Sequence, residues 1–280
     1  MILKNQILSR AGQKPIIFDL FYKKTKKPKP LIIFCHGYKG FKDWGAWNLM
    51  AKAFMNADLF FVKLNFSHNG GTVENPIDFS DLEAFAENNY TKEIADLDVI
   101  LTHCLSEGTN FTMEIDPTNV TVIGHSRGGG IAIIKASEDS RITKLITLAS
   151  VCDFAKRTAI SGDLDAWKKE GVKYVLNGRT KQQMPHNYQF YEDFKAHETR
   201  LNIEQAEKSL VIPHAIIHAI DDPSVNYKEA KLLKQWNPKA TLISVENSDH
   251  VFGAKHPWHD ERMPPVLKQI TKMALSLIKD

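Results

Sequence analysis

Short runs of mostly apolar residues recur along this chain of 280 residues, and they restrict its fold more than any other feature. Each run has the length of one β-strand, and near-continuous apolar strands are typical of a sheet that is covered on both faces. The segments between the runs have the spacing of amphipathic helices. This alternation predicts an α/β fold with a mostly parallel sheet and helices on both faces. The runs are residues 31–35, 59–64, 120–123, 145–148, 215–219 and 242–245.

Two other patterns complete the predicted secondary structure. In residues 91–107, Ile94, Leu97 and Leu101 follow the i, i+3, i+7 spacing of a helix, and acidic residues lie near the start. At the N-terminus, residues 2–8 and 16–22 are rich in apolar and β-branched residues and flank a short turn, which predicts antiparallel strands. Further helices are predicted over residues 47–57, 128–137, 227–236 and 265–278.

The connection between the strands near residues 148 and 214 is too long for one crossover helix. Residues 153–211 amount to 59 positions, whereas a crossover needs about a dozen. We expect extra helices there, as a short helical lid inserted into a single domain that spans residues 1–280. Two interpretations of its aromatic residues stay open: they form a lid or pocket wall, or they pack only against one another. They are Phe154, Trp167, Tyr174, Tyr188, Phe190, Tyr191 and Phe194.

The charge balance argues against a protein that binds nucleic acid. With 36 Lys and Arg against 33 Asp and Glu, the net charge is +3, which is too small for the basic surface that nucleic acid requires. The one dense basic run, residues 23–30, contains two prolines and is predicted to be a solvated turn. We therefore expect no nucleic-acid partner. These features do not predict an oligomeric state.

Three features favour a reducing, cytoplasmic location. Cys35, Cys104 and Cys152 are odd in number and lie in or beside apolar segments, where a thiol behaves as a small hydrophobic residue. Residues 1–10 interrupt their apolar content with Lys and Asn, so they lack the core of a signal peptide. No apolar run approaches the length of a membrane span. We expect a soluble protein without a membrane-spanning segment.

The strongest chemical signal is the motif Gly124-His125-Ser126-Arg127-Gly128, which follows a predicted strand and precedes a predicted helix. A serine exposed on a sharp strand-to-helix turn needs strained backbone angles. Glycine two residues before and two after it removes the Cβ atoms that would collide within the turn. The helix N-terminus also favours a developing negative charge. This pattern predicts that Ser126 is a nucleophile.

At this motif the chain resembles the α/β-hydrolase superfamily, and the resemblance extends over nearly its whole length. His36-Gly37-Tyr38, after the strand at residues 31–35, is similar to the turn with which that superfamily builds part of its oxyanion hole. The resemblance implies that the main-chain amides of Tyr38 and Arg127 are the oxyanion donors. Since both are backbone groups, the geometry of the turn matters more than the side chains.

The same resemblance implies that the catalytic acid follows the strand at residues 215–219. Two aspartates compete there. Asp222 fits the spacing of the superfamily, with Ala219 in place of its usual glycine and Val225 three residues later, so we expect Asp222 to be the acid. Asp221 stays open as the alternative; the aspartate that is not the acid is expected to be a capping or turn carboxylate.

The candidate base is His250, in the loop after the strand at residues 242–245, where the superfamily carries its histidine. The order Ser126, Asp222, His250 is the order expected for this fold. The histidines of residues 250–261 do not have the spacing of a zinc site, and no cysteine pair joins them, so we expect neither a metal nor a cofactor. His256 and His259 are predicted loop residues, and His36 is predicted to orient a loop.

These residues predict a hydrolase that cleaves carboxylic esters of a small molecule through an acyl-enzyme. The chain resembles small acyl or cinnamoyl esterases and the catalytic domains of acylaminoacyl and dipeptidyl peptidases. It has no room for the propeller of those peptidases, and Ser126 stands where related dehalogenases and epoxide hydrolases carry Asp. A peptidase or thioesterase, and a ligand-binding protein without turnover, stay as alternatives. The aromatic residues of 153–211 favour an apolar or aromatic acyl group.

Overall fold

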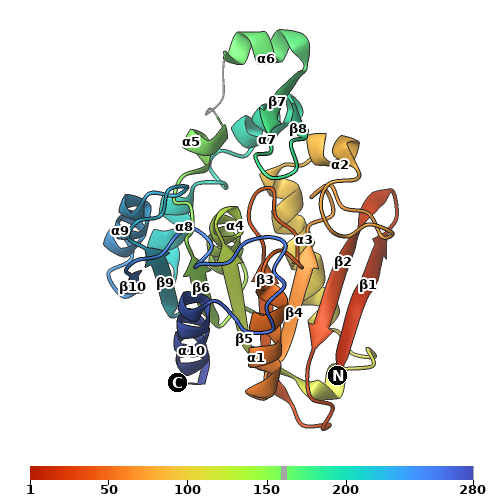
Figure 1. Ribbon diagram of the computed structural model, residues 1–280, viewed down its shortest axis with the longest axis vertical. Helices are drawn as coiled ribbons and strands as arrows, with labels where there is room; N and C mark the ends of the chain where they lie inside the picture. Colours follow the sequence, from red (N-terminus) through yellow and green to blue (C-terminus); the bar gives the residue numbers. More distant parts are fainter. Residues whose placement is uncertain (159–162, 280) are drawn as a thin grey trace.

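The computed structural model describes residues 1–158 and 163–279 and contains an eight-stranded mixed sheet in the order β1-β2-β4-β3-β5-β6-β9-β10 (Figure 1). Strand β2 runs antiparallel to both β1 and β4, and the strands from β4 to β10 are parallel. The predicted α/β fold and antiparallel N-terminal pair are confirmed. The strands are β1 (Ile2–Arg10), β2 (Gln13–Phe21), β3 (Lys29–Cys35), β4 (Phe60–Asn65), β5 (Ile115–His125), β6 (Lys144–Leu148), β9 (His214–Ala219) and β10 (Thr241–Val245).

Helices cover both faces of this sheet because successive side chains of its buried strands point in opposite directions. Ile33 of β3 belongs to the hydrophobic cluster of one face, and its neighbour Ile32 belongs to the cluster of the other. The first cluster includes side chains of α3 (Tyr90–Leu105), α4 (Arg127–Glu138) and α9 (Tyr227–Trp236). The second includes α1 (Trp47–Asn56) and α10 (Pro265–Lys279). All five predicted helices are confirmed.

The segment 153–211 differs from its prediction as a purely helical insertion. It contains a two-stranded antiparallel hairpin, β7 (Val172–Leu176) and β8 (Gln183–Asn187). The sequence carries a signal for it: Val172, Tyr174 and Val175 favour a strand, and Asn177-Gly178 is a turn pair. The helices of this segment are α5 (Phe154–Thr158), α6 (Leu164–Glu170), α7 (Gln189–Ala196) and α8 (Ile203–Ser209). Short α2 (Leu82–Ala86) and a 3-10 turn at Thr112–Glu114 were also not predicted.

Most aromatic residues of this segment pack against the main core and not only against one another. Phe154 stacks on Tyr90 of α3, with ring centroids 3.9 Å apart, and belongs to the same core cluster as the sheet. Trp167 belongs to that cluster as well, and Tyr188 and Tyr191, which contact Trp167 and each other, pack against it. Tyr174 is exposed. The interpretation that these rings pack only against one another is therefore wrong.

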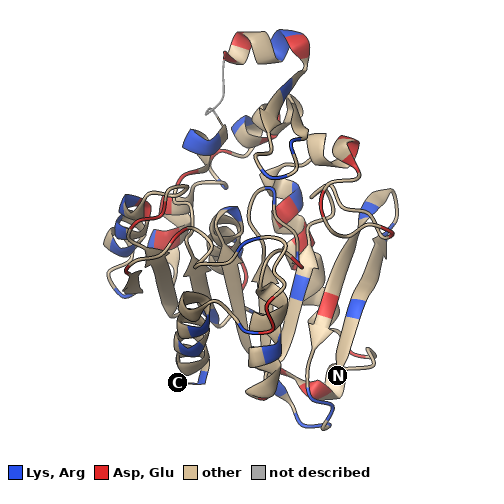
Figure 2. Cartoon of the chain, in the orientation of Figure 1, with Lys and Arg blue, Asp and Glu red and all other residues tan. Residues whose placement is uncertain are grey.

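A buried ionic cluster fixes the loop between β3 and α1. Asp19 of β2 accepts from Lys63 of β4 at 2.7 Å and pairs with Lys42 of the loop at 2.8 Å, and all three side chains are fully buried. Asp43 pairs with Lys63 at 2.6 Å, and Lys4 of β1 joins the same cluster. Figure 2 shows the basic and acidic bands of β1, β2 and β4 at one level of the sheet. These contacts hold the residues that follow the predicted oxyanion turn.

Other predictions concern the cysteines and membrane spans. Cys35, Cys104 and Cys152 are free and buried, as expected from their apolar surroundings. Among the described residues no helix has both the length and the apolar character needed to cross a membrane.

Candidate active site

Ser126 lies on the turn between β5 and α4, in the strand-to-helix context that the motif predicted. Its φ is +56° and its ψ is −119°, angles that a residue with a side chain rarely adopts. The flanking glycines permit the turn. A Cβ on Gly124 would lie 2.3 Å from the carbonyl oxygen of Gly128, and one on Gly128 would lie 2.4 Å from that of His36. The spacing of the motif therefore reflects close backbone contacts on both sides of the serine.

The structure brings Asp222 and His250 together. Asp222 follows β9 and His250 follows β10, and the two strands are neighbours in the sheet. The distance from His250 Nδ1 to Asp222 Oδ2 is 2.7 Å. Asp222 Oδ1 accepts from the amides of Ser224 at 2.8 Å and Val225 at 2.9 Å. Of the two aspartates, Asp222 is buried against the histidine and Asp221 is exposed.

Hydrogen bonding keeps the Asp222 carboxylate ionised. Burial raises the pKa of Asp222, but the hydrogen bond and charge of His250 and the amides of Val225 and Ser224 outweigh it, so the pKa lies below its usual value. An ionised Asp222 accepts from Nδ1 of His250 and thereby holds its Nε2 unprotonated. That tautomer is the one in which a histidine acts as a base.

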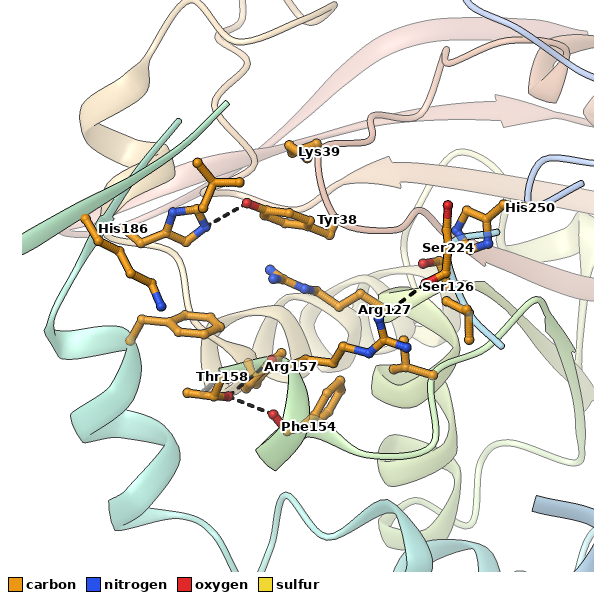
Figure 3. Close-up of a pocket in the computed structure, with 16 residues that line it drawn as sticks. Tyr38, Lys39, Ser126, Arg127, Phe154, Arg157, Thr158, His186, Ser224 and His250 are labelled. Carbon is orange, nitrogen blue, oxygen red and sulfur yellow. Dashed lines mark hydrogen bonds between the residues drawn. The ribbon is translucent and has the colours of Figure 1, made fainter. Parts of the chain in front are cut away.

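Ser126 and His250 line one cavity of about 390 Å³. Figure 3 shows both side chains at the same end of it. Within residues 1–158 and 163–279, the Ser126 hydroxyl has no hydrogen-bond partner. Proton transfer needs a contact between this hydroxyl and Nε2 of His250, and such contacts often form only when substrate is bound.

The amides proposed as oxyanion donors flank the serine. A Cβ on Gly37 would lie 2.8 Å from the Cβ of Ser126, so the turn that carries Tyr38 packs directly on the serine. Arg127 is the first residue of α4, and its amide has no acceptor within that helix. In the hydrogen bonds formed among the described residues neither the Tyr38 amide nor the Arg127 amide takes part.

Two further histidines hold this arrangement, and sequence reasoning missed one of them. His125 Nε2 lies 2.9 Å from the carbonyl oxygen of His250 and so fixes the loop of the candidate base. Burial, with the neighbouring charge of His250, lowers the pKa of His125 to about 3. His36 contacts the Gly37 carbonyl at 2.9 Å, as expected for a residue that orients this turn, and burial lowers its pKa to about 4. The position of His125 inside the motif was its only sequence signal.

The histidines after residue 250 lie apart from the cavity. His256 accepts from the Gly45 amide at 3.0 Å and packs edge-on against Phe41, and His259 is exposed in the same loop. In the described parts of the chain, no group of three His, Cys, Asp or Glu side chains has the arrangement of a metal site.

Sequence reasoning also missed the side chains at the far end of the cavity. Arg127 extends along it, with its guanidinium 4.3 Å from the ring centroid of Tyr38 (Figure 3). The Tyr38 hydroxyl lies 2.9 Å from Nε2 of His186, in strand β8 of the insertion. Phe154 and Phe190 add to the wall, so the insertion does form part of the cavity. No local pattern marks these contacts, because they depend on how the insertion docks.

Comparisons with known proteins agree with the fold. No family model and no curated protein sequence matches the chain. Among solved structures, Est1E from Butyrivibrio proteoclasticus has a TM-score of 0.70 at 13% identity, covering 98% of this chain and 97% of that one. DcsB, in complex with its substrate analogue, has a TM-score of 0.72 at 14% identity, covering 98% of both chains. Pyrococcus horikoshii acylaminoacyl peptidase has 0.67 at 13%, covering 99% of this chain and 41% of that one.

These similarities, together with the sheet order and the turn at Ser126, show that the chain has the α/β-hydrolase fold. At such low identity they define the fold and leave the chemistry to be argued from the site itself.

Proposed function

We propose that this protein is a serine hydrolase that cleaves carboxylic esters of a small molecule, working as a single domain with residues 153–211 as its lid. The observation that carries the proposal is the contact of 2.7 Å between His250 and Asp222 beside the strained turn of Ser126. Acyl transfer to serine needs an exposed serine and an imidazole that a carboxylate orients. The turn at Ser126, with φ of +56°, exposes the serine, and Asp222 orients the imidazole of His250.

The mechanism follows from these positions. Ser126 Oγ attacks the ester carbonyl while His250 Nε2 takes its proton. The amides of Tyr38 and Arg127 donate to the oxyanion of the tetrahedral intermediate. His250 then protonates the leaving alcohol, and an acyl group remains on Ser126. Water, deprotonated by His250, attacks this acyl-enzyme, and the acid is released as Ser126 regains its proton. Asp222 stays ionised throughout and stabilises the imidazolium.

The character of the cavity supports a small, partly aromatic acyl substrate. Tyr38, Tyr90, Phe154 and Phe190 line it, and its volume of about 390 Å³ is in the range of sites for small organic molecules. A structure of Est1E, whose fold is similar, contains bound ferulic acid. Peptide and thioester bonds pass through the same tetrahedral intermediate, so peptidase and thioesterase activities are the alternatives within this mechanism.

The decisive experiment is intact-mass analysis after treatment with a fluorophosphonate, which labels an activated serine. We expect one adduct on the wild type and none on Ser126→Ala. Ser224→Ala is the matched control, since Ser224 lines the same cavity; it should be labelled like the wild type. Circular dichroism melting checks that each variant is folded. Absence of labelling in folded wild-type protein contradicts the proposal and favours a ligand-binding protein without turnover.

A further inference from the structure

The cavity beside Ser126 has an excess of positive charge. Four of its lining residues are cations: Lys39, Arg127, Arg157 and Lys173. None of the described residues that line it is Asp or Glu. All four are partly withdrawn from solvent. Each such cation costs desolvation free energy unless it is paired, so a cavity for neutral esters alone would gain nothing from them.

Arg127 is the most unusual of these cations. Its side chain is only 12% exposed, and its acceptor within the described residues is Oε1 of Glu93, at a long 3.4 Å from Nη1. A guanidinium has several N–H donors in a planar fork. The rest of this fork is surrounded by the rings of Tyr38, Tyr90 and Phe190, with centroids 4.3, 5.2 and 5.5 Å away. Arg127 therefore has hydrogen-bond donors to spare inside a largely apolar cavity.

Of the other three cations, Lys39 and Lys173 add to the excess of positive charge and Arg157 does not. Arg157 is paired with Glu229 and points the opposite way from Arg127, toward Ser224 (Figure 3). Lys39 and Lys173 have no carboxylate partner among the described residues, and their ammonium groups lie 5.0 Å from the Tyr38 ring and 3.6 Å from the Trp167 ring.

His186 lines the same cavity as Arg127, Lys39 and Lys173 and is affected by their positive charges. Burial and the charges of Arg127, Lys173 and Lys39 lower the pKa of His186 to about 3. The three unpaired or weakly paired cations thus act on one region, the end of the cavity under the hairpin β7–β8.

We propose that the substrate carries a carboxylate, bound by the Arg127 fork at the hairpin end of the cavity, with its flat or apolar body between the aromatic rings. This proposal rests on the proposed ester hydrolysis. The amide of Arg127 faces the reacting carbonyl and its guanidinium faces the carboxylate, so the two groups of the substrate are separated by about the length of an arginine side chain. The substrate class is therefore that of monoesters of dicarboxylic acids, or of esters whose alcohol carries a carboxylate.

Two pairs of esters distinguish a carboxylate on the acyl group from a carboxylate on the leaving alcohol. Methyl 4-carboxycinnamate and its neutral isostere methyl 4-carbamoylcinnamate place the charge on the acyl group. The acetyl esters of 4-hydroxybenzoate and 4-hydroxybenzamide differ in the charge of the leaving group. Their enzymatic rates are divided by their rates of hydrolysis by hydroxide, which corrects for the different leaving-group ability of the two phenols. We expect kcat/KM for the charged member of one pair to exceed that of the neutral member by about ten-fold or more. Equal values in both pairs overturn the proposal.

Variants test whether Arg127 is responsible. In Arg127→Gln the ratio of charged to neutral kcat/KM should fall by about ten-fold, and Arg127→Lys, which keeps the charge and loses the fork, should give an intermediate ratio. Lys52→Gln removes a cation from an exposed position of α1 and should leave the ratio unchanged. An unchanged ratio in Arg127→Gln, or an equal fall in Lys52→Gln, contradicts the assignment.

A binding measurement separates this proposal from the proposed function. Titration calorimetry on Ser126→Ala compares the affinities of methyl 4-carboxycinnamate and methyl 4-carbamoylcinnamate without turnover, and of 4-acetoxybenzoate and its amide in the same way. Tighter binding of a charged member supports the anion site even if no ester is cleaved. Equal affinities overturn it even if Ser126 is labelled by a fluorophosphonate. The two proposals therefore fail by different results.

Discussion

The hydroxyl of Tyr38 donates a hydrogen bond to Nε2 of His186 across 2.9 Å, which joins the turn of the proposed oxyanion hole to strand β8 of the insertion. The direction follows from the other ring nitrogen: Nδ1 of His186 faces the carbonyl oxygen of Met184 at 3.2 Å and must carry the proton. Burial raises the pKa of Tyr38 to about 12, so the phenol stays a donor at all working pH values.

Removal of this hydrogen bond should loosen the turn without removing its amide. We expect Tyr38→Phe to keep the ring contacts with Arg127 and to lower kcat/KM for a good ester by about five-fold, with a loss of about 1 kcal/mol in unfolding free energy. Ester kinetics and urea denaturation measure the two effects. A double-mutant cycle with His186→Leu supplies the control, because the two changes should not be additive if they break the same bond.

The two neighbouring aspartates allow a matched test of the triad. Asp222→Asn should lower kcat by about 10³ to 10⁴-fold, because an amide leaves the imidazole in the wrong tautomer. Asp221→Asn removes a carboxylate one residue away that is exposed, and should change kcat by less than about two-fold. Steady-state kinetics on both variants, with melting temperatures, decide this. The reverse result would make Asp221 the acid.

The sequence predicted the parts of this molecule that depend on local pattern. Continuous apolar runs specify strands buried on both faces, and the spacing Gly124-Ser126-Gly128 is imposed by contacts under 3 Å that any Cβ would make. The hairpin β7–β8 was missed because a short, half-exposed strand pair in an insertion has a weak pattern. The contacts of Arg127 with Tyr38 and Phe190 depend on how segments far apart in the chain dock together.

The buried ionic cluster should make the fold sensitive to the loss of one charge. Asp19 faces both Lys42 and Lys63, and all three side chains are inaccessible to solvent. Asp19→Asn leaves buried ammonium groups without full compensation, so we expect a loss of about 3 to 5 kcal/mol in unfolding free energy. Asp260→Asn changes an exposed aspartate in the same way and should leave the unfolding free energy nearly unchanged. Equilibrium denaturation of both proteins provides the comparison.

The buried histidines predict how stability depends on pH. Burial lowers the pKa of His36 to about 4 and those of His125 and His186 to about 3. In the unfolded chain a histidine has a pKa of about 6.5. Between about pH 6.5 and 4 the unfolded chain therefore binds protons that the folded chain does not, and the free energy of unfolding falls as pH is lowered. Above about pH 6.5 these histidines cause no loss of unfolding free energy.

Each buried histidine contributes a slope of up to about 1.4 kcal/mol per pH unit, so the three together give up to about 4 kcal/mol per pH unit. Urea denaturation at intervals from pH 7.5 to 4.5 measures this slope. His186→Gln should reduce it by up to about 1.4 kcal/mol per pH unit, because one titrating group is removed. His259→Gln, at an exposed loop position, should leave it unchanged. A slope that is the same in wild type and His186→Gln would mean that His186 is protonated in the folded protein, and its hydrogen bond with Tyr38 would then run in the opposite direction.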